Sequence, residues 1–364
     1  MLDATKFRNL VSGQRRGLAA TAWRTLFSLA EFPYRLAVAW RNRQFDTGRR
    51  TAHQVGVPVI SVGNLTVGGT GKTPMVEWLA KWFGRHGIRV VVISRGYGAR
   101  AGSRNDEALE LEQKLPDVPH LQNPDRVEAA TAAIGEFNSQ LILLDDAFQH
   151  RRIHRDLNLV LIDALEPFGY GHLLPRGLLR EPIAGLRRAD VVVLTRADAV
   201  GPEVRAQIRD EVSACAGDAV WIEVAHQPIA LRNHTGQKKA LDPLPARRIA
   251  AFCGIGNPAG FRHSLTACGF DIVGFREFPD HHAFDRDDLN SLDAWLRELN
   301  VDAAICTHKD LVKIGTDSIG AGSNEAGSTG SCPLWALQIG MEILDGVEQL
   351  EEQLSALVEL IEPT

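Results

Sequence analysis

Residues 57–98 read VPVISVGNLTVGGTGKTPMVEWLAKWFGRHGIRVVVISRGYG. The run from Val57 to Val62 is short, apolar and β-branched, as in strands that are buried on both faces. A glycine-rich turn follows, then an amphipathic segment to about Arg85 and a second apolar run from Val90 to Ile93. This order predicts a βαβ unit with a phosphate-binding loop between its first strand and its helix.

The turn carries groups that bind phosphate. Glycines allow backbone N–H groups to face phosphate oxygens, and the helix N-terminus adds partial positive charge. Lys72 would reach the β- and γ-phosphates of a nucleoside triphosphate, and the Thr73 hydroxyl would bind Mg2+. Thr66 stands where such loops usually carry a glycine. The alternative is a turn whose glycines only allow close packing. We predict that the nucleotide is bound by Gly68, Gly69, Thr70, Gly71, Lys72 and Thr73.

Composition indicates a globular protein with a large core. The chain has 364 residues, of which 45% are hydrophobic and 23% are charged. This length predicts two domains, or one large domain with an appendage. The five cysteines are scattered and form no CxxC pair, which argues against a disulfide framework or a zinc site and fits a reducing compartment.

The first 50 residues differ in charge from the rest. They carry ten Lys or Arg against three acidic residues, a net charge of +7 within a chain of net charge -5. Trp23, Leu26, Phe27 and Ala30 have helical spacing, and a second segment with Tyr34, Leu36 and Trp40 follows Pro33. We predict a basic amphipathic arm over residues 1–50 that lies on an anionic membrane surface. The alternative is a helix that packs its apolar face on the domain.

Other sequence features exclude some classes of protein. The apolar stretches of the arm are interrupted by arginines, so no signal peptide is expected. No uncharged apolar run is long enough to span a membrane. No DNA- or RNA-binding motif accompanies the basic residues, so we expect no nucleic-acid partner.

Further apolar runs predict the rest of the fold. The strand at residues 141–144 ends in Asp145 and Asp146, and such a strand tip holds or orients Mg2+ in phosphate-loop enzymes. Apolar runs alternate with helical segments, which predicts an α/β fold with a mostly parallel sheet and helices on both faces. We assign residues 51–225 to this core, 226–248 to a connection, and 249–364 to a second, smaller α/β domain. The second domain contains Phe278-Pro279-Asp280-His281-His282, whose histidines are candidates to assist a catalytic carboxylate.

These motifs together resemble the tetraacyldisaccharide 4'-kinases of the lipid A pathway. The resemblance covers nearly the whole chain. It rests on GNLTVGGTGKTP at 63–74, SRGYG at 94–98, LLDDAFQH at 143–150, LPRGLLREP at 174–182, GIGNP at 254–258, FPDHH at 278–282 and THKD at 307–310.

The resemblance implies ATP- and Mg2+-dependent transfer of a phosphoryl group to the 4'-hydroxyl of an acylated glucosamine disaccharide 1-phosphate. It implies that Asp106 is the catalytic aspartate, that His281 pairs with it, and that Lys72, Arg126, Arg180 and Glu181 belong to the catalytic site. Metal ligands would be Thr73, Asp145, Asp146 and Glu181. The sequence departs from the family at Asn105-Asp106-Glu107-Ala108, where Gly-Asp-Glu-Pro is usual, and His282 is the alternative partner of Asp106.

Two other functions remain open at this point. One is a phosphate-loop switch or metal chaperone that acts on a protein, although Thr195-Arg196-Ala197-Asp198 lacks the Asn and Lys of a guanine signature. The other is a cytosolic small-molecule kinase, which would leave the arm unexplained. No obligate protein partner is evident, and the expected location is the cytoplasmic face of the inner membrane, with peripheral attachment and no transmembrane span.

Overall fold

A computed structural model of the chain describes residues 4–96, 106–241, 248–279, 282–317 and 332–361. The chain divides into two compact units. The first unit comprises Met1–His226 together with Met341–Thr364, and the second comprises Gln227–Gly340. Strands β7 (Val220–Arg232) and β12 (Leu334–Asp345) each contribute residues to both units.

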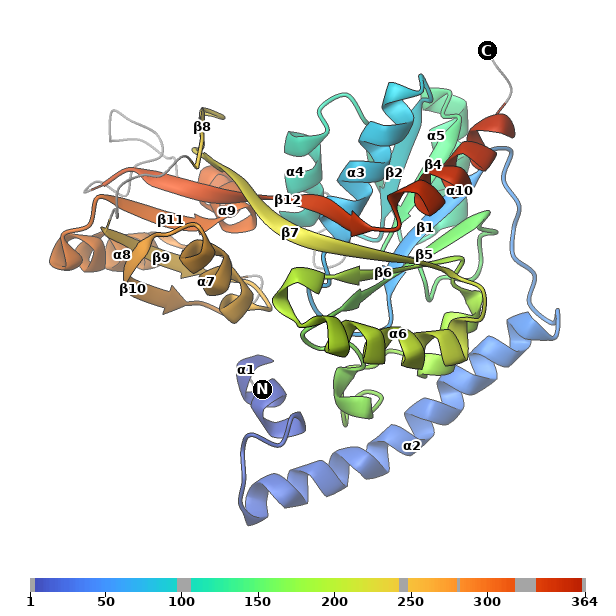
Figure 1. The fold of residues 1–364 in the computed structure, drawn as a ribbon, viewed down its shortest axis with the longest axis horizontal. Helices are drawn as coiled ribbons and strands as arrows, with labels where there is room; N and C mark the ends of the chain where they lie inside the picture. The colour runs from blue at the N-terminus through green and yellow to red at the C-terminus, as the bar shows by residue number, and fades with distance from the viewer. Residues whose placement is uncertain (1–3, 97–105, 242–247, 280–281, 318–331, 362–364) are drawn as a thin grey trace. The chain divides into compact units, whose positions relative to one another are not determined.

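The first unit is built on a parallel sheet (Figure 1). Its strand order is β7-β6-β5-β1-β4-β2-β3, and every neighbouring pair in this row is parallel. The central strands are buried along their whole length, as expected for a sheet that is covered on both faces. The bounds are β1 Val59–Asn64, β2 Val90–Ser94, β3 His120–Gln122, β4 Leu141–Asp145, β5 Leu157–Asp163 and β6 Val191–Thr195.

Helices cover both faces of this sheet. One face packs against α3 (Lys72–Arg85), α4 (Asp106–Lys114) and α10 (Val347–Glu359), which share one hydrophobic cluster with the strands. The opposite face packs against α5 (Arg126–Phe137), α6 (Pro202–Ala216) and the 3-10 helix η2 (Ile183–Arg188). Two further 3-10 helices are η1 (Gly169–Gly171) and η3 (Ala197–Ala199).

The N-terminal arm forms a short helix, α1 (Ala4–Val11), and a long one, α2 (Leu18–Asp46). Two segments were expected on either side of Pro33, and α2 runs through this residue as one helix (Figure 1). Proline removes one backbone donor, which leaves the carbonyl four residues earlier without its helical partner. That carbonyl belongs to Leu29, which is exposed, so water can satisfy it.

The second unit contains a smaller parallel sheet of order β10-β9-β11-β12. The short strand β8 is antiparallel to the end of β7. The bounds are β8 Lys238–Lys239, β9 Arg248–Cys253, β10 Asp271–Glu277, β11 Ala303–Thr307, α7 Pro258–Ala267, α8 Arg286–Leu299 and α9 His308–Asp317.

The predicted fold class is confirmed: a mostly parallel α/β sheet with helices on both faces, a smaller α/β unit and a helical arm. The compact units differ from the predicted boundaries in two respects. The segment 226–248 contains the second half of β7 and the strand β8. The last segment, predicted to lie in the second domain, belongs to the first unit, because Leu350, Leu354 and Leu357 of α10 are buried in the cluster that contains α3.

Candidate active site

The predicted phosphate-binding loop is the segment that connects β1 to α3. Gly71 is the N-cap of α3 and has φ 84°, and Gly68 has φ 129°. Both angles favour glycine, because a Cβ is strained in this region. A Cβ at Gly71 would also collide with the imidazole of His226 at the middle of β7. Gly71 is therefore required both by its backbone angle and by the packing of a residue that the sequence did not indicate.

Lys72 lies between an amide and a carboxylate. Its Nζ is 3.4 Å from Asn64 Oδ1 and 3.5 Å from Asp146 Oδ1. Asn64 is fully buried at the end of β1, and its Nδ2 donates to the Thr66 carbonyl at 2.7 Å. The amide is thus fixed by the loop that it supports, and it holds the lysine beside the loop. Asn64 was missed as a site residue, although its place at a strand end just before the glycines was a usable signal.

Asp146 follows β4 and pairs with two cations. Its φ of 52° is left-handed, a conformation that Asp tolerates better than most residues. Arg180 NH1 donates to both of its carboxylate oxygens, at 2.8 and 2.9 Å. Burial acts to raise the pKa of Asp146, but Lys72 and Arg180 outweigh it and lower the pKa to about 2. Asp146 is therefore ionised at neutral pH, and Lys72, Asp146 and Arg180 form one charged cluster.

The end of β4 is held against the end of β1. Asp145 is buried and pairs in register with Val62 of β1. A Cβ at Gly63 would lie 2.6 Å from the Phe148 Cβ, so only glycine allows this approach. The predicted acidic strand tip thus lies beside the strand that leads into the phosphate loop. Sequence order placed these segments about eighty residues apart.

Arg126 begins α5 and is buried. Its NH1 donates to the carbonyls of Asn123 and Pro124 at 3.4 and 3.3 Å. Burial and then the nearby Arg95 lower the pKa of Arg126, whereas Asp146 and Asp145 act in the opposite direction. The guanidinium is therefore within electrostatic reach of both aspartates, as expected for a residue of the same site.

Glu181 has a different environment from the one that the sequence suggested. It is completely buried, and its Oε1 accepts from Gln149 Nε2 at 2.9 Å. Its Oε2 accepts from Arg188 at 2.7 Å and from Asn42 at 3.2 Å. Gln149 also donates to the Asn64 carbonyl at 2.9 Å. Glu181 therefore links the arm and the loop. It is poorly available as a metal ligand because it is fully buried and protein donors engage both of its oxygens, whereas the Asp146 side chain is 37% exposed.

A second ion pair lies on the other side of the loop. Arg196 follows β6 and pairs with Asp163 at the end of β5, and its NH2 also donates to the Gly69 carbonyl at 3.0 Å. These residues hold the loop from the carboxyl ends of β5 and β6. Burial and then Arg196 lower the pKa of His226 to about 4, so its imidazole is neutral near pH 7.

The pair predicted as the catalytic base lies outside the described side chains. Asp106 begins α4, but its side chain is among those that the structure does not describe, and His281 lies outside the described residues. The alternative partner, His282, is described. Its Nε2 is 2.7 Å from Asp288 Oδ2, and Asp288 is part of the capping box of α8. His282 is thus engaged within the second unit.

The motif Thr307-His308-Lys309-Asp310 has a structural contact in the second unit. Asp310 is buried and accepts from the Gly254 N–H at 3.0 Å and from Thr307 Oγ1 at 2.6 Å. Burial raises the pKa of Asp310. The motif that begins at Gly254 and the motif that ends at Asp310 are therefore joined by a hydrogen bond.

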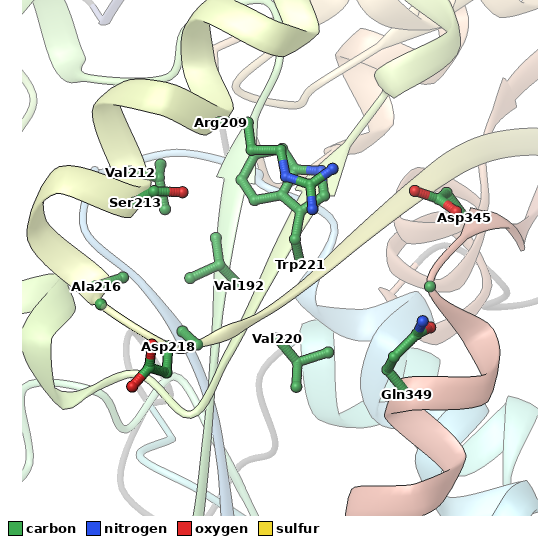
Figure 2. A pocket seen from close by; sticks show the side chains of 13 residues that line it. Val192, Arg209, Val212, Ser213, Ala216, Asp218, Val220, Trp221, Asp345 and Gln349 are labelled. Atoms are coloured by element: carbon green, nitrogen blue, oxygen red, sulfur yellow. The ribbon is translucent and has the colours of Figure 1, made fainter.

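A cavity of about 410 Å³ lies elsewhere in the first unit (Figure 2). Its walls come from the end of α6, the start of β7 and the start of α10. In Figure 2 the Arg209 side chain lies next to the Trp221 ring, and the guanidinium carbon is 5.9 Å from the ring centroid. Val192, Val220 and Trp221 of this lining stand at the amino ends of β6 and β7, whereas the phosphate loop follows the carboxyl end of β1. None of the predicted site residues lines this cavity.

The residues at the loop fit Mg2+. Thr73 offers a hydroxyl and Asp145 and Asp146 offer carboxylates, the oxygen donors that this cation prefers. Within the described ranges, no three His, Cys, Asp or Glu side chains gather into a metal site of their own. A Mg2+ ion that takes few protein ligands and completes its shell with phosphate oxygens and water is the usual arrangement in enzymes that bind nucleotides.

Comparisons with known proteins agree with the geometry. Residues 23–359 match the model of the family described as tetraacyldisaccharide-1-P 4'-kinase. The tetraacyldisaccharide 4'-kinase of Anaeromyxobacter dehalogenans is 39% identical over 347 residues, with 90% of this chain and 89% of that protein covered. The enzyme of the same name from Halothermothrix orenii is 35% identical over 339 residues and covers 85% of this chain and 88% of its own.

A solved structure is also similar. It is LpxK from Aquifex aeolicus in complex with ATP, which has a TM-score of 0.70 and 28% identity. The alignment covers 92% of this chain and 99% of that one.

Proposed function

The chain belongs to the family of tetraacyldisaccharide-1-P 4'-kinases, and from this premise we propose that it transfers the γ-phosphoryl group of ATP to the 4'-hydroxyl of an acylated glucosamine disaccharide 1-phosphate in lipid A biosynthesis. The observation that carries the proposal is the cluster of Lys72, Asp146 and Arg180 at a glycine loop, within a chain matched over residues 23–359. The comparisons favour this reading over a phosphate-loop switch or a metal chaperone.

The loop would bind the triphosphate. Phosphoryl transfer needs positioning and charge neutralisation more than covalent chemistry. Gly68, Gly69 and Gly71 would present backbone N–H groups, with the N-terminus of α3 behind them. Lys72, now held between Asn64 and Asp146, would turn to the phosphates when the nucleotide binds.

Thr73, Asp145 and Asp146 would hold Mg2+, which neutralises phosphate charge when bound. We assign Glu181 to positioning and not to the metal, because it is fully buried and Gln149, Asn42 and Arg188 already donate to its oxygens. Arg180 is bound to Asp146 and would be drawn toward the phosphates. Arg126, buried near both aspartates, would add positive charge to the site.

Asp106 would accept the proton of the attacking hydroxyl, and His281 would pair with it. The support is the position of these residues in the family motifs. His282 is engaged by Asp288, which makes His281 the better candidate of the two histidines. A positioned carboxylate and histidine typically contribute about 10²–10⁴-fold to proton transfer.

The arm would bring the enzyme to its lipid substrate. Large apolar side chains of α2 are exposed on one side: Leu18, Trp23, Leu26, Leu29, Phe32, Leu36 and Trp40. The opposite side packs on the first unit through buried Ala20, Glu31 and Val38. Tyr34 Oη donates to the Arg180 carbonyl at 2.9 Å, so the inner side of α2 contacts the active-site segment. This arrangement supports an arm that lies on the membrane over a helix that packs its apolar face on the domain, because the exposed apolar side of α2 is not the side that packs on the first unit.

Peripheral attachment to the cytoplasmic face of the inner membrane follows from this proposal. Among the residues that the structure describes, no helix combines the length and apolar character needed to cross a bilayer. Arginines that flank the apolar side of α2 would favour anionic headgroups. ATP, Mg2+, the acylated disaccharide and an anionic surface are then the partners that the enzyme requires.

The test is incubation of the full chain with labelled ATP, Mg2+ and a set of acceptors. We expect label on the acylated disaccharide 1-phosphate, none on soluble glucosamine, and none on the protein. Label only on a soluble sugar, or phosphate release that is independent of any acceptor, would contradict the proposal.

A further inference from the structure

A side chain of the arm reaches the phosphate loop from outside the segment that the family model matches. Arg8 lies in α1, and the family match begins at residue 23. A Cβ placed on Gly68 would be 2.8 Å from Arg8 NH2. The guanidinium therefore occupies the space that the missing Gly68 side chain leaves. None of the sequence motifs indicated Arg8, because it is separated from the loop by sixty residues.

The helix that carries Arg8 is fixed on the first unit. Leu10 and Val11 are buried, and the Val11 carbonyl accepts from Arg176 NH1 at 3.1 Å. Phe7 contacts Phe27 of α2 with a centroid distance of 5.9 Å. These contacts involve residues on either side of Arg8 in α1. The packing of the helix therefore places Arg8 beside the loop.

The basic side chains around the loop differ in whether a carboxylate contacts them. Lys72 and Arg180 both contact Asp146, and Arg196 pairs with Asp163. No described carboxylate lies within ion-pair distance of Arg8, although Glu166 lies close enough to interact with it electrostatically. Arg8 thus adds positive charge at the loop that the neighbouring acids do not neutralise by direct contact.

We propose that Arg8 binds a phosphate group at the phosphate loop. A guanidinium presents a planar set of donors that matches phosphate oxygens, and its charge is permanent. The proposal rests on the proposed function, which places two sources of phosphate at this site. One is the triphosphate of ATP, and the other is the 1-phosphate of the acceptor. In either case α1 contributes directly to the active site and is more than part of a membrane anchor.

The experiment compares Arg8→Ala, Arg8→Lys and the matched control Arg16→Ala in the full chain. Arg16 is an exposed arginine of the same arm, so its removal changes the arm's charge equally. Binding of MgATP and MgADP is measured by calorimetry without acceptor. Steady-state kinetics then use acylated disaccharide acceptors with and without the 1-phosphate, and vesicle sedimentation measures membrane binding of each variant.

We expect Arg8→Ala to lose about tenfold or more in one of these quantities, because a charge-assisted hydrogen bond is removed. Weaker binding of MgATP, with or without an equal effect on MgADP, assigns Arg8 to the nucleotide. A higher KM confined to the acceptor that carries the 1-phosphate assigns it to the acceptor. Arg8→Lys should recover part of the loss, since it restores charge without the planar donors. Arg16→Ala should bind MgATP and MgADP like the unchanged protein, and any change in its acceptor kinetics should follow its vesicle binding.

Two results would overturn the proposal. One is unchanged nucleotide binding and unchanged kinetics in Arg8→Ala. The other is an equal loss of activity in Arg8→Ala and Arg16→Ala that parallels a loss of vesicle binding. That result would mean that Arg8 acts only through attraction to the membrane. Activity of the unchanged protein in the same assay separates this outcome from failure of the proposed function. Matching thermal unfolding midpoints would show that the variants are folded.

Discussion

Replacing Glu31 tests whether α2 is held on the active-site segment by its inner side. Glu31 is buried, and its Oε1 accepts from the Leu173 N–H at 3.1 Å and from Arg35 at 2.7 Å. Its Oε2 is 3.1 Å from His172 Nδ1. Glu31→Ala leaves the Leu173 N–H without this acceptor. A hydrogen bond to a charged group contributes about 1.5–3 kcal/mol. The Arg35 pair contributes at most about 0.5 kcal/mol, because Arg35 is 56% exposed.

We therefore expect Glu31→Ala to weaken local docking by about 2–3 kcal/mol. Hydrogen exchange of the Leu173 amide measures this directly, since its protection should fall by about 30- to 150-fold. Glu31→Gln keeps a neutral acceptor and should lose about 1 kcal/mol. Arg35→Ala is the matched control and should have little effect. Unchanged exchange at Leu173 in Glu31→Ala would refute the docking role.

The same contact predicts a pH dependence. Burial acts to raise the pKa of Glu31, but hydrogen bonds from Arg35, Leu173 and His172 outweigh it and leave the pKa below its ordinary value of 4.5. A carboxylate with a lowered pKa contributes stability above the pKa of the unfolded chain and loses it as the pH falls through the folded value. The difference in Leu173 amide protection between the unchanged protein and Glu31→Gln should therefore be largest near neutral pH. It should shrink as the pH falls below 4.5. A constant difference would mean that the charge of Glu31 does not matter.

Three further predictions concern the chemistry and the membrane. Lys72→Ala should lower kcat by about a hundredfold or more, because a cation on the transferring phosphate is lost in a shielded site, and near-normal turnover of the folded variant in the labelled-ATP assay would make the loop a packing turn. Asp106→Ala and His281→Ala should be strongly non-additive in kcat when combined, whereas additive losses in that double-mutant cycle would assign them to separate sites. Phe32→Glu should reduce sedimentation with anionic vesicles more than Ser28→Glu, because Phe32 is 64% exposed on the apolar side of α2. High salt should weaken but not abolish binding of the unchanged protein, and equal effects of the two substitutions would argue against that side as the membrane face.

The sequence alone determined the fold class and the phosphate loop, because both depend on local patterns. A β-branched run, a glycine turn with Gly71, Lys72 and Thr73, and a helical period specify a βαβ unit without long-range information. The apolar runs after it specified further buried strands, and the charges near α2 specified an amphipathic helix. The resemblance added the remaining site residues by their motifs.

Only the tertiary structure decided which side chains meet. Burial on two faces of the sheet brought Asp146 and Arg180 to Lys72, and it turned Glu181 inward onto Gln149 and Arg188. No spacing in the sequence could distinguish a carboxylate that faces a metal from one that accepts hydrogen bonds in the core, since both occur in the same motif.

The domain boundary and the arm also depend on long-range packing that the sequence pattern does not reveal. The leucines of α10 are as apolar as those of a helix in the second domain, and only packing against the α3 side of the sheet assigns them to the first unit. Pro33 separated two expected segments, but the helix continues through it, and the carbonyl left without a helical partner belongs to Leu29, an exposed residue. Arg8 reached Gly68 across sixty residues because α1 folds back on the first unit, and that proximity is set by long-range packing, which a local pattern does not encode.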